Sequence, residues 1–212
     1  YPEFDENKHV IEPFDFPFDW QNNISIDPGL NNPLSAHWYC VDYDDTVYVV
    51  AEHFESGKDV EYHSEAIKKK CDQIGWRRDN DGRIRALIDS AANQKTLSSL
   101  KSVTELFYDY GILVNPKVNK DLFSGIARVK EYLKNDRLYI FKTCTNLIRE
   151  LKRYRWGDGD VPKKVDDHSL DELRYFIMSR PKPEKKDGNK SVITIDKERL
   201  YRKIKRGRKN SR

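Results

Sequence analysis

The sequence has 212 residues, 37% of them hydrophobic and 12% aromatic, with a formal net charge of +4; this composition is typical of a folded domain and excludes a disordered chain. No stretch approaches the roughly 18 apolar residues of a membrane span, and no signal peptide is visible, so we expect no membrane partner. The three cysteines, Cys40, Cys71 and Cys144, form no CxxC pair. We therefore expect buried free thiols and neither a disulfide framework nor a structural zinc site.

Three segments follow one another along the chain. Residues 1–22 are rich in Pro, Asp, Asn and Phe and are expected to form an extended lead-in whose aromatic rings dock on the body. Residues 23–180 are expected to form the folded domain. Residues 181–212 are expected to be a linker, a short β-prone piece at 192–195 and a basic tail. The last sixteen residues carry a charge of +8, which suits a phosphate backbone or an acidic partner.

Within the body, three strands precede an alternation of helices and strands. Alternating and β-branched residues predict strands, and apolar spacing of three to four predicts helices. The expected strands cover residues 23–27, 35–42, 46–54, 84–89, 112–114 and 138–141. The expected helices cover residues 58–75, 94–103, 119–133, 143–154 and 169–178. This order predicts an α/β fold with a mixed sheet flanked by helices.

Two aspartates end apolar strands. Asp27 follows Ile24-Ser25-Ile26 and precedes Pro-Gly, and Asp89 follows Ile84–Ile88 and precedes Ser-Ala-Ala. An unpaired charge at the exit of a buried strand is costly, so these acids are candidates for chemistry. Small residues after an acid also let a ligand approach the backbone. The alternative for each aspartate is an N-cap of the next helix.

A third acidic element lies near the end of the body. His168 and Asp171 are three residues apart, so a helix beginning here shows both on one face, while Leu170, Leu173 and Ile177 point into the core. The alternative is a well-capped helix with Asp167 as its cap. Two strand-end aspartates and one helix-borne aspartate are the acids that two-metal phosphodiester cleavage requires, with Mg²⁺ or Mn²⁺ as suitable ions.

Three sequence segments resemble the nuclease motifs of the large terminase subunits of tailed bacteriophages. They are Ser-Ile-Asp-Pro-Gly at 25–29, Leu-Ile-Asp-Ser-Ala-Ala at 87–92 and Asp-His-Ser-Leu-Asp-Glu-Leu-Arg-Tyr at 167–175, within a similarity that runs from about residue 22 to 178. The resemblance implies an RNase H/integrase-like fold and two divalent ions, Mg²⁺ or Mn²⁺, held by Asp27, Asp89 and Asp171, with His168 near the same cluster. It also implies endonucleolytic cutting of double-stranded viral DNA concatemers during genome packaging.

The resemblance leaves alternatives for some of the site residues and for the function. Asp166 or Asp167 is an alternative to Asp171 as the third ligand, and Glu52, on the third strand, is a minor candidate against the alternative of a surface acid. A junction resolvase or transposase-like nuclease of the same fold is an alternative function. A non-catalytic domain that binds DNA or a motor partner is another.

The resemblance also implies partners and a location. The partners are double-stranded DNA, an N-terminal ATPase domain of the same polypeptide, the portal protein and the small terminase subunit, and the location is the cytoplasm of the infected bacterial host. This chain begins at Tyr1 and lacks a GxxxxGK[ST] phosphate loop. We therefore expect it to be the nuclease part of a longer polypeptide, with no translocation activity of its own.

Two basic stretches besides the tail are candidates for contact with DNA phosphates. One comprises Arg77, Arg78, Arg83 and Arg85 around an Asp-Asn-Asp-Gly turn, and the other comprises Arg149, Lys152, Arg153 and Arg155. We expect the turn at 79–82 to stand beside the active site. The alternative is a plain solvated turn.

Overall fold

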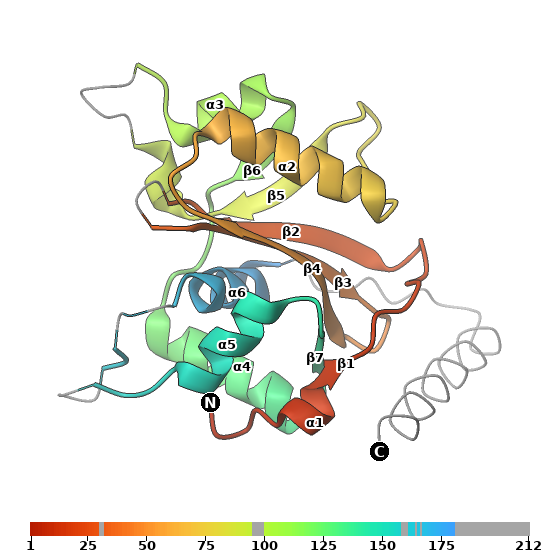
Figure 1. The fold of residues 1–212 in the computed structure, drawn as a ribbon, viewed down its shortest axis with the longest axis vertical. Coiled ribbons are helices and arrows are strands. Elements are labelled where there is room, and N and C mark those ends of the chain that lie inside the picture. The colour runs from red at the N-terminus through yellow and green to blue at the C-terminus, as the bar shows by residue number, and fades with distance from the viewer. Residues whose placement is uncertain (30–31, 95–99, 158–160, 164, 166, 181–212) are drawn as a thin grey trace.

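A twisted sheet separates two groups of helices in the computed structural model (Figure 1). The structure describes residues 1–29, 32–94, 100–157, 161–163, 165 and 167–180. Within these residues, the strands form one seven-stranded sheet in the order β1-β7-β4-β3-β2-β5-β6. The strands are β1 (Val10–Ile11), β2 (Gln21–Asp27), β3 (Leu34–Val41), β4 (Val47–Glu55), β5 (Ile84–Ile88), β6 (Ile112–Asn115) and β7 (Leu138–Phe141).

The sheet is mixed, as expected. β3 pairs antiparallel with both β2 and β4, whereas β5 runs parallel to β2 and to β6, and β7 runs parallel to β4 and to β1. Every residue of β3 is buried, because this central strand is covered on both faces. Parallel pairing of β2 with β5 brings the carboxyl ends of these two strands to the same edge of the sheet.

Helices cover both faces (Figure 1). One face carries α2 (Val60–Gln73) and α3 (Val103–Asp109), and the other carries α4 (Leu122–Lys134), α5 (Thr145–Arg153) and α6 (His168–Ser179). Helix α6 packs on β2, β3 and β5. Its residues Leu170, Leu173 and Ile177 are buried in the core, as the sequence predicts.

The lead-in differs in part from the extended segment that was expected. It contains a one-turn helix, α1 (Glu6–His9), and β1, which adds to the sheet beside β7. The Asp5 carboxylate caps α1 by accepting a hydrogen bond from the Asn7 amide. The expected docking of aromatic rings is confirmed, since Phe14 packs edge-on against Phe141 and Trp20.

The helix expected at 94–103 is wrong over its described part. A short 3-10 helix, η1 (Ser90–Asn93), precedes this range, and α3 begins only at Val103; residues 95–99 lie outside the described part of the chain. The start of α3 is set by a capping box, in which Ser102 accepts from the Glu105 amide and the Glu105 carboxylate accepts from the Ser102 amide.

Cys40, Cys71 and Cys144 are free and buried, as expected. Among the described helices, none is long and apolar enough to cross a membrane. The β-prone piece at 192–195 and the basic tail lie outside the described residues.

Candidate functional site

Asp27 and Asp89 lie beside each other at the carboxyl ends of β2 and β5. Ile26 is in register with Ile88, and the Asp89 amide donates to the Ile26 carbonyl at 3.3 Å. Each aspartate is only 8% exposed. The parallel pairing therefore brings together two carboxylates that are 62 residues apart in the sequence.

Helix α6 lies against this edge and presents one face to it. His168, Asp171 and Tyr175 share that face, because they are spaced by three and four residues. His168 Nδ1 lies 3.1 Å from Asp27 Oδ2, and the Tyr175 hydroxyl donates to Asp89 Oδ2 at 3.0 Å. Asp171 is placed along the helix between these two contacts.

The carboxylate of Asp171 is not in contact with the strand-end pair. It forms an ion pair with Arg174 and lines a groove of about 300 Å³ together with Lys120, Asp167 and Tyr175. Among the residues that the structure describes, no group of three or more His, Cys, Asp or Glu side chains is gathered closely enough to hold a metal ion. The structure thus brings two of the three expected ligands together and places the third on the adjoining helix face.

The two strand-end carboxylates differ electrostatically. Burial raises the pKa of Asp27; the hydrogen bond with His168 opposes this rise, and repulsion from Asp89 adds to it. The hydrogen bond with Asp27 in turn raises the pKa of His168. A buried carboxylate next to a second one is stabilised by a positive charge, and oxygen ligands of this kind suit a hard divalent cation. The donor set therefore fits Mg²⁺ or Mn²⁺ in kind.

The negative charge of Asp89 is more strongly stabilised by its surroundings than that of Asp27. Burial opposes its ionisation, but hydrogen bonds from Lys120 Nζ and the Ala91 amide, both at 2.7 Å, and from Tyr175 outweigh burial and lower the pKa of Asp89. The bond from Ala91 makes Asp89 the N-cap of η1, so the capping alternative holds for this residue. Asp89 Oδ1 carries out that role, while Oδ2 faces Tyr175.

The chain matches a known family over most of its length. A family model described as "Terminase RNaseH-like domain" matches residues 24–180, a range that contains Asp27, Asp89 and α6. The chain belongs to this family. No match is found among curated proteins.

Solved terminase structures share the fold, which confirms the RNase H-like architecture. The large terminase of the thermophilic bacteriophage D6E, in complex with ADP, superposes with a TM-score of 0.68 at 24% identity, over 83% of this chain and 43% of that protein. The P22 large terminase nuclease domain gives 0.69 at 20% identity, over 82% and 89% of the two chains. The large terminase nuclease of the thermophilic phage G20c, with bound magnesium, gives 0.54 at 11%, over 82% and 94%. This terminase domain therefore spans less than half of the D6E protein.

Gly29 of the terminase domain has a structural reason to be glycine. A Cβ at this position would lie 2.4 Å from the Asn32 carbonyl oxygen and 2.7 Å from that of Pro33. The sequence suggested that a small residue here serves ligand approach. The structure shows instead that the chain folds back on itself directly after Asp27, so the glycine shapes the loop that leaves the site.

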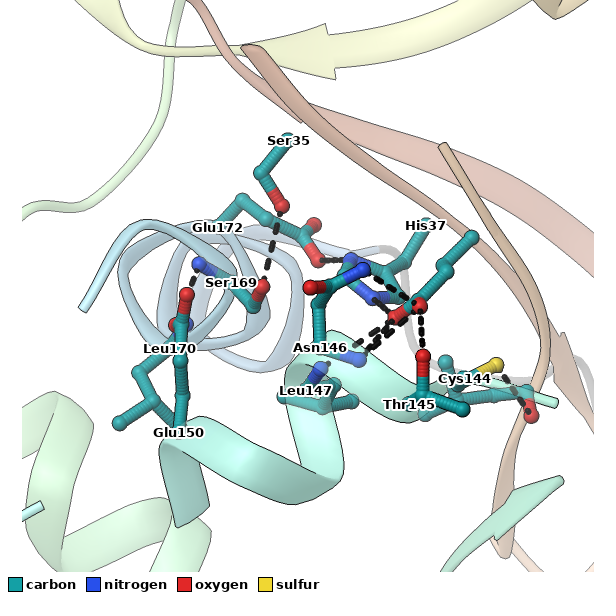
Figure 2. Close-up of polar contacts among 12 residues, drawn as sticks. Ser35, His37, Cys144, Thr145, Asn146, Leu147, Glu150, Ser169, Leu170 and Glu172 are labelled. Atoms are coloured by element: carbon teal, nitrogen blue, oxygen red, sulfur yellow. Dashed lines mark hydrogen bonds and ion pairs between the residues drawn. The ribbon is translucent and has the colours of Figure 1, made fainter. Parts of the chain in front are cut away.

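The N-terminus of α6 is held by a carboxylate from another helix. Glu150 of α5 accepts hydrogen bonds from the Ser169 and Leu170 amides at 2.8 and 3.2 Å (Figure 2). Asp167, the expected cap, makes no side-chain cap bond, and Asp166 lies outside the described residues. Glu150 is fully buried, and burial raises its pKa to about 7. This role is not recognisable from sequence alone, because a glutamate within an amphipathic helix is normally a surface residue.

A second carboxylate, that of the half-buried Glu52, holds α5, and this corrects the expectation for Glu52. The Glu52 carboxylate accepts from the Asn146 and Leu147 amides at the start of α5 and lies 3.2 Å from His37 Nε2. Glu52 is therefore a tertiary cap of α5 and not part of the aspartate site.

His37 joins this cap to α6 (Figure 2). Its Nδ1 forms an ion pair with Glu172, which is fully buried and also accepts from the Tyr39 hydroxyl at 2.7 Å. Burial opposes the charge on His37, but Glu172 and Glu52 outweigh it and raise its pKa to about 9. The network fixes α6, and with it His168 and Tyr175, against the sheet.

The expected basic loop beside the site is located elsewhere. Residues 76–83 precede β5, whereas Asp89 follows it, so the length of a five-residue strand, roughly 17 Å, separates them. Arg77 donates to the Phe18 carbonyl and to Asn22 Oδ1, and it lies over the Phe18 ring. The prediction that this turn stands beside the aspartates is wrong, because it lies at the opposite end of β2 and β5. In the second basic stretch, Lys152 pairs with Glu6 at 2.6 Å.

Proposed function

We propose that this chain is a divalent-metal-dependent endonuclease domain that hydrolyses phosphodiesters of double-stranded DNA with two ions, Mg²⁺ or Mn²⁺. The observation that carries the proposal is the side-by-side placement of Asp27 and Asp89 at the ends of two parallel strands. Membership of the terminase RNaseH-like family supports the nuclease role. The G20c nuclease, which shares the fold, binds magnesium and cobalt.

In this proposal Asp27, Asp89 and Asp171 are the ligands. Bound ions would activate a water molecule and neutralise the charge on the phosphate. Asp27 and Asp89 supply fixed oxygen donors, because the paired strands and the η1 cap hold their backbones. Asp171 would exchange its partner Arg174 for the ion, and Arg174 would retain its contact with the Tyr154 hydroxyl.

His168 is a positioning residue in this proposal. Its ring nitrogen lies 3.1 Å from Asp27 Oδ2, so it orients that carboxylate and supplies a proton-carrying group at the rim of the site. The adjoining groove, lined by Lys120, Asp171 and Tyr175, gives the phosphate backbone a place to enter.

Membership of the terminase family supports a proposal about the biological setting. We infer that the domain cuts concatemeric viral DNA during genome packaging, in the cytoplasm of the infected bacterial host. The chain spans 43% of the D6E large terminase, whose structure contains ADP. An ATPase domain of the same polypeptide is thus the proposed first partner, with the portal protein and the small terminase subunit as further partners.

A plasmid-nicking assay with Mn²⁺ tests the function. We expect the wild type to nick and linearise supercoiled DNA, and Asp27→Ala and Asp89→Ala each to lose at least about a hundredfold in rate. Asp72→Ala, which removes an exposed acid paired with Arg78, is the matched control and should cut normally. Binding of DNA without any cleavage would favour the non-catalytic domain, and a preference for branched over linear DNA would favour a junction resolvase.

A further inference from the structure

Lys120 is a cation built into the edge of the aspartate site. Its Nζ lies 2.7 Å from Asp89 Oδ1 and 5.9 Å from the centre of the Tyr175 ring. The side chain is 41% exposed and lines the groove that also contains Asp171. The ammonium therefore lies between a buried carboxylate and the open groove.

The backbone around Lys120 is anchored on both sides. The Asn119 amide donates to Ser179 Oγ at the end of α6, at 2.7 Å. Asp121, on the other side, caps α4 by accepting from the Ser124 amide at 2.7 Å. The loop thus ties α4 to α6 and presents a lysine to Asp89 from a fixed starting point.

We propose that Lys120 is a catalytic residue that moves its charge from Asp89 to the scissile phosphate. This inference rests on the proposed nuclease function. A divalent ion on Asp89 would repel an ammonium at this distance, since like charges 4 Å apart oppose each other appreciably even in water. The flexible lysine stem then carries the charge to the nearest remaining anion, a phosphate in the groove.

At the phosphate, the Lys120 ammonium would stabilise the negative charge that develops during hydrolysis. A water oxygen forms a bond to phosphorus, one P–O ester bond breaks, the water proton passes to solvent and the leaving oxygen takes up a proton. Lys120 donates a hydrogen bond to a non-bridging oxygen, where negative charge increases as the two bonds are exchanged. The same side chain thus competes with the ion for Asp89 and assists the ion at the phosphate.

Loss of Lys120 should change two measurable quantities in opposite directions: the affinity for the ion should rise, and the cleavage rate should fall. A purely structural role would not produce both changes. The ion pair is partly buried, since Asp89 is 8% exposed. Replacing a purely structural Lys120 would therefore lower the free energy of unfolding but would leave the cleavage rate at saturating Mn²⁺ unchanged. A catalytic Lys120 that shares Asp89 with the ion predicts that Lys120→Met binds the ion more tightly and yet cuts more slowly.

The test combines an ion titration with single-turnover cleavage. Mn²⁺ affinity without DNA is measured by calorimetry, and plasmid cleavage is measured at saturating Mn²⁺. For Lys120→Met we expect about five- to tenfold tighter Mn²⁺ binding and about a hundredfold slower cleavage. Lys120→Arg, which keeps the charge, should return the Mn²⁺ affinity to about that of the wild type and part of the rate.

The control is Lys117→Met, which removes the same charge from an exposed position in the same loop and should change neither quantity. If the wild type cuts DNA but Lys120→Met has an unchanged cleavage rate or an unchanged Mn²⁺ affinity, the proposed role of Lys120 is overturned and the nuclease function is not. Absence of cutting by the wild type would overturn the nuclease function and this role with it.

Discussion

The Tyr175 hydroxyl donates a hydrogen bond to Asp89 Oδ2 at 3.0 Å, across 86 residues of sequence. About two helical turns earlier, His168 contacts Asp27. Helix α6 therefore touches both strand-end carboxylates with side chains from one face. The two contacts show that the helix is part of the site and not merely a cover for the sheet.

Replacing Tyr175 by Phe should destabilise the domain. The variant loses a buried hydrogen bond to an ionised acceptor, which corresponds to about 1.5–3 kcal/mol of the free energy of unfolding. Urea unfolding measures the loss. Tyr62→Phe is the matched control, because Tyr62 donates its hydrogen bond to Glu55 on the exposed surface, and this variant should unfold at nearly the same urea concentration as the wild type. Equal losses in the two variants would contradict the importance of the Tyr175–Asp89 bond.

Glu150→Gln should make stability less dependent on pH. The folded protein raises the pKa of Glu150 from its ordinary 4.5 to about 7 through burial. The folded state therefore binds this proton more tightly than the unfolded state, and stability falls as the pH rises from about 4.5 to about 7. Glutamine lacks this titration, so the variant should match the wild type at pH 4.5 and exceed it by about 1–3 kcal/mol at pH 8.

Thermal unfolding of Glu150→Gln and the wild type across this pH range provides the measurement. Glu131→Gln, at an exposed position on α4, should leave the pH profile unchanged. A stability difference between Glu150→Gln and the wild type that stayed constant with pH would show that Glu150 does not titrate in this range.

His37→Leu should cost about 3–5 kcal/mol, because it leaves the fully buried Glu172 without its positive partner. Removing both charges in His37→Leu with Glu172→Met should cost less than the single change. A double-mutant cycle by urea unfolding measures this coupling. If the stability losses of the two single variants add up to that of the double variant, His37 and Glu172 do not stabilise each other.

Gly29→Ala should displace the loop after Asp27, since its Cβ would meet backbone oxygens at 2.4 and 2.7 Å. We expect a loss of about 1–3 kcal/mol in the free energy of unfolding and slower DNA cleavage. Gly125→Ala is the comparison, because the atoms nearest to its Cβ would be side-chain atoms of Arg174, at 3.0 to 3.3 Å, and not backbone oxygens. Normal stability and cleavage in Gly29→Ala would contradict a tight turn at this point.

Asp27→Asn should stabilise the domain in EDTA by about 0.5–2 kcal/mol, because it removes a buried charge that is repelled by Asp89. Mn²⁺ should then raise the melting temperature of the wild type but not that of the variant, since binding to the folded state alone is stabilising. An equal rise in both proteins would place the ion elsewhere.

Much of the site follows from sequence because it depends on strand ends. Asp27 and Asp89 terminate apolar runs, and parallel pairing of those runs necessarily brings the two residues to one edge. The spacing of His168 and Asp171, with leucines between and after them, likewise defined one helix face. These features are local in sequence and periodic, so they can be recognised without coordinates.

The features that sequence did not predict are tertiary. Glu150 and Glu52 cap helices to which they do not belong, and nothing near either residue distinguishes it from a surface glutamate. Lys120 lies in a polar loop, and only the fold shows that it reaches Asp89. The helix expected over 94–103 ends where α3 begins, because the Ser102–Glu105 capping box starts a helix at Val103.

Helix α6 is the last element of the described chain, and it carries His168, Asp171 and Tyr175. During synthesis the residues of the sheet leave the ribosome before this helix. A chain that ends before residue 168 lacks His168, Asp171 and Tyr175. Under the proposed function, such a chain would have an incomplete set of acids, so cutting would require translation of the whole domain.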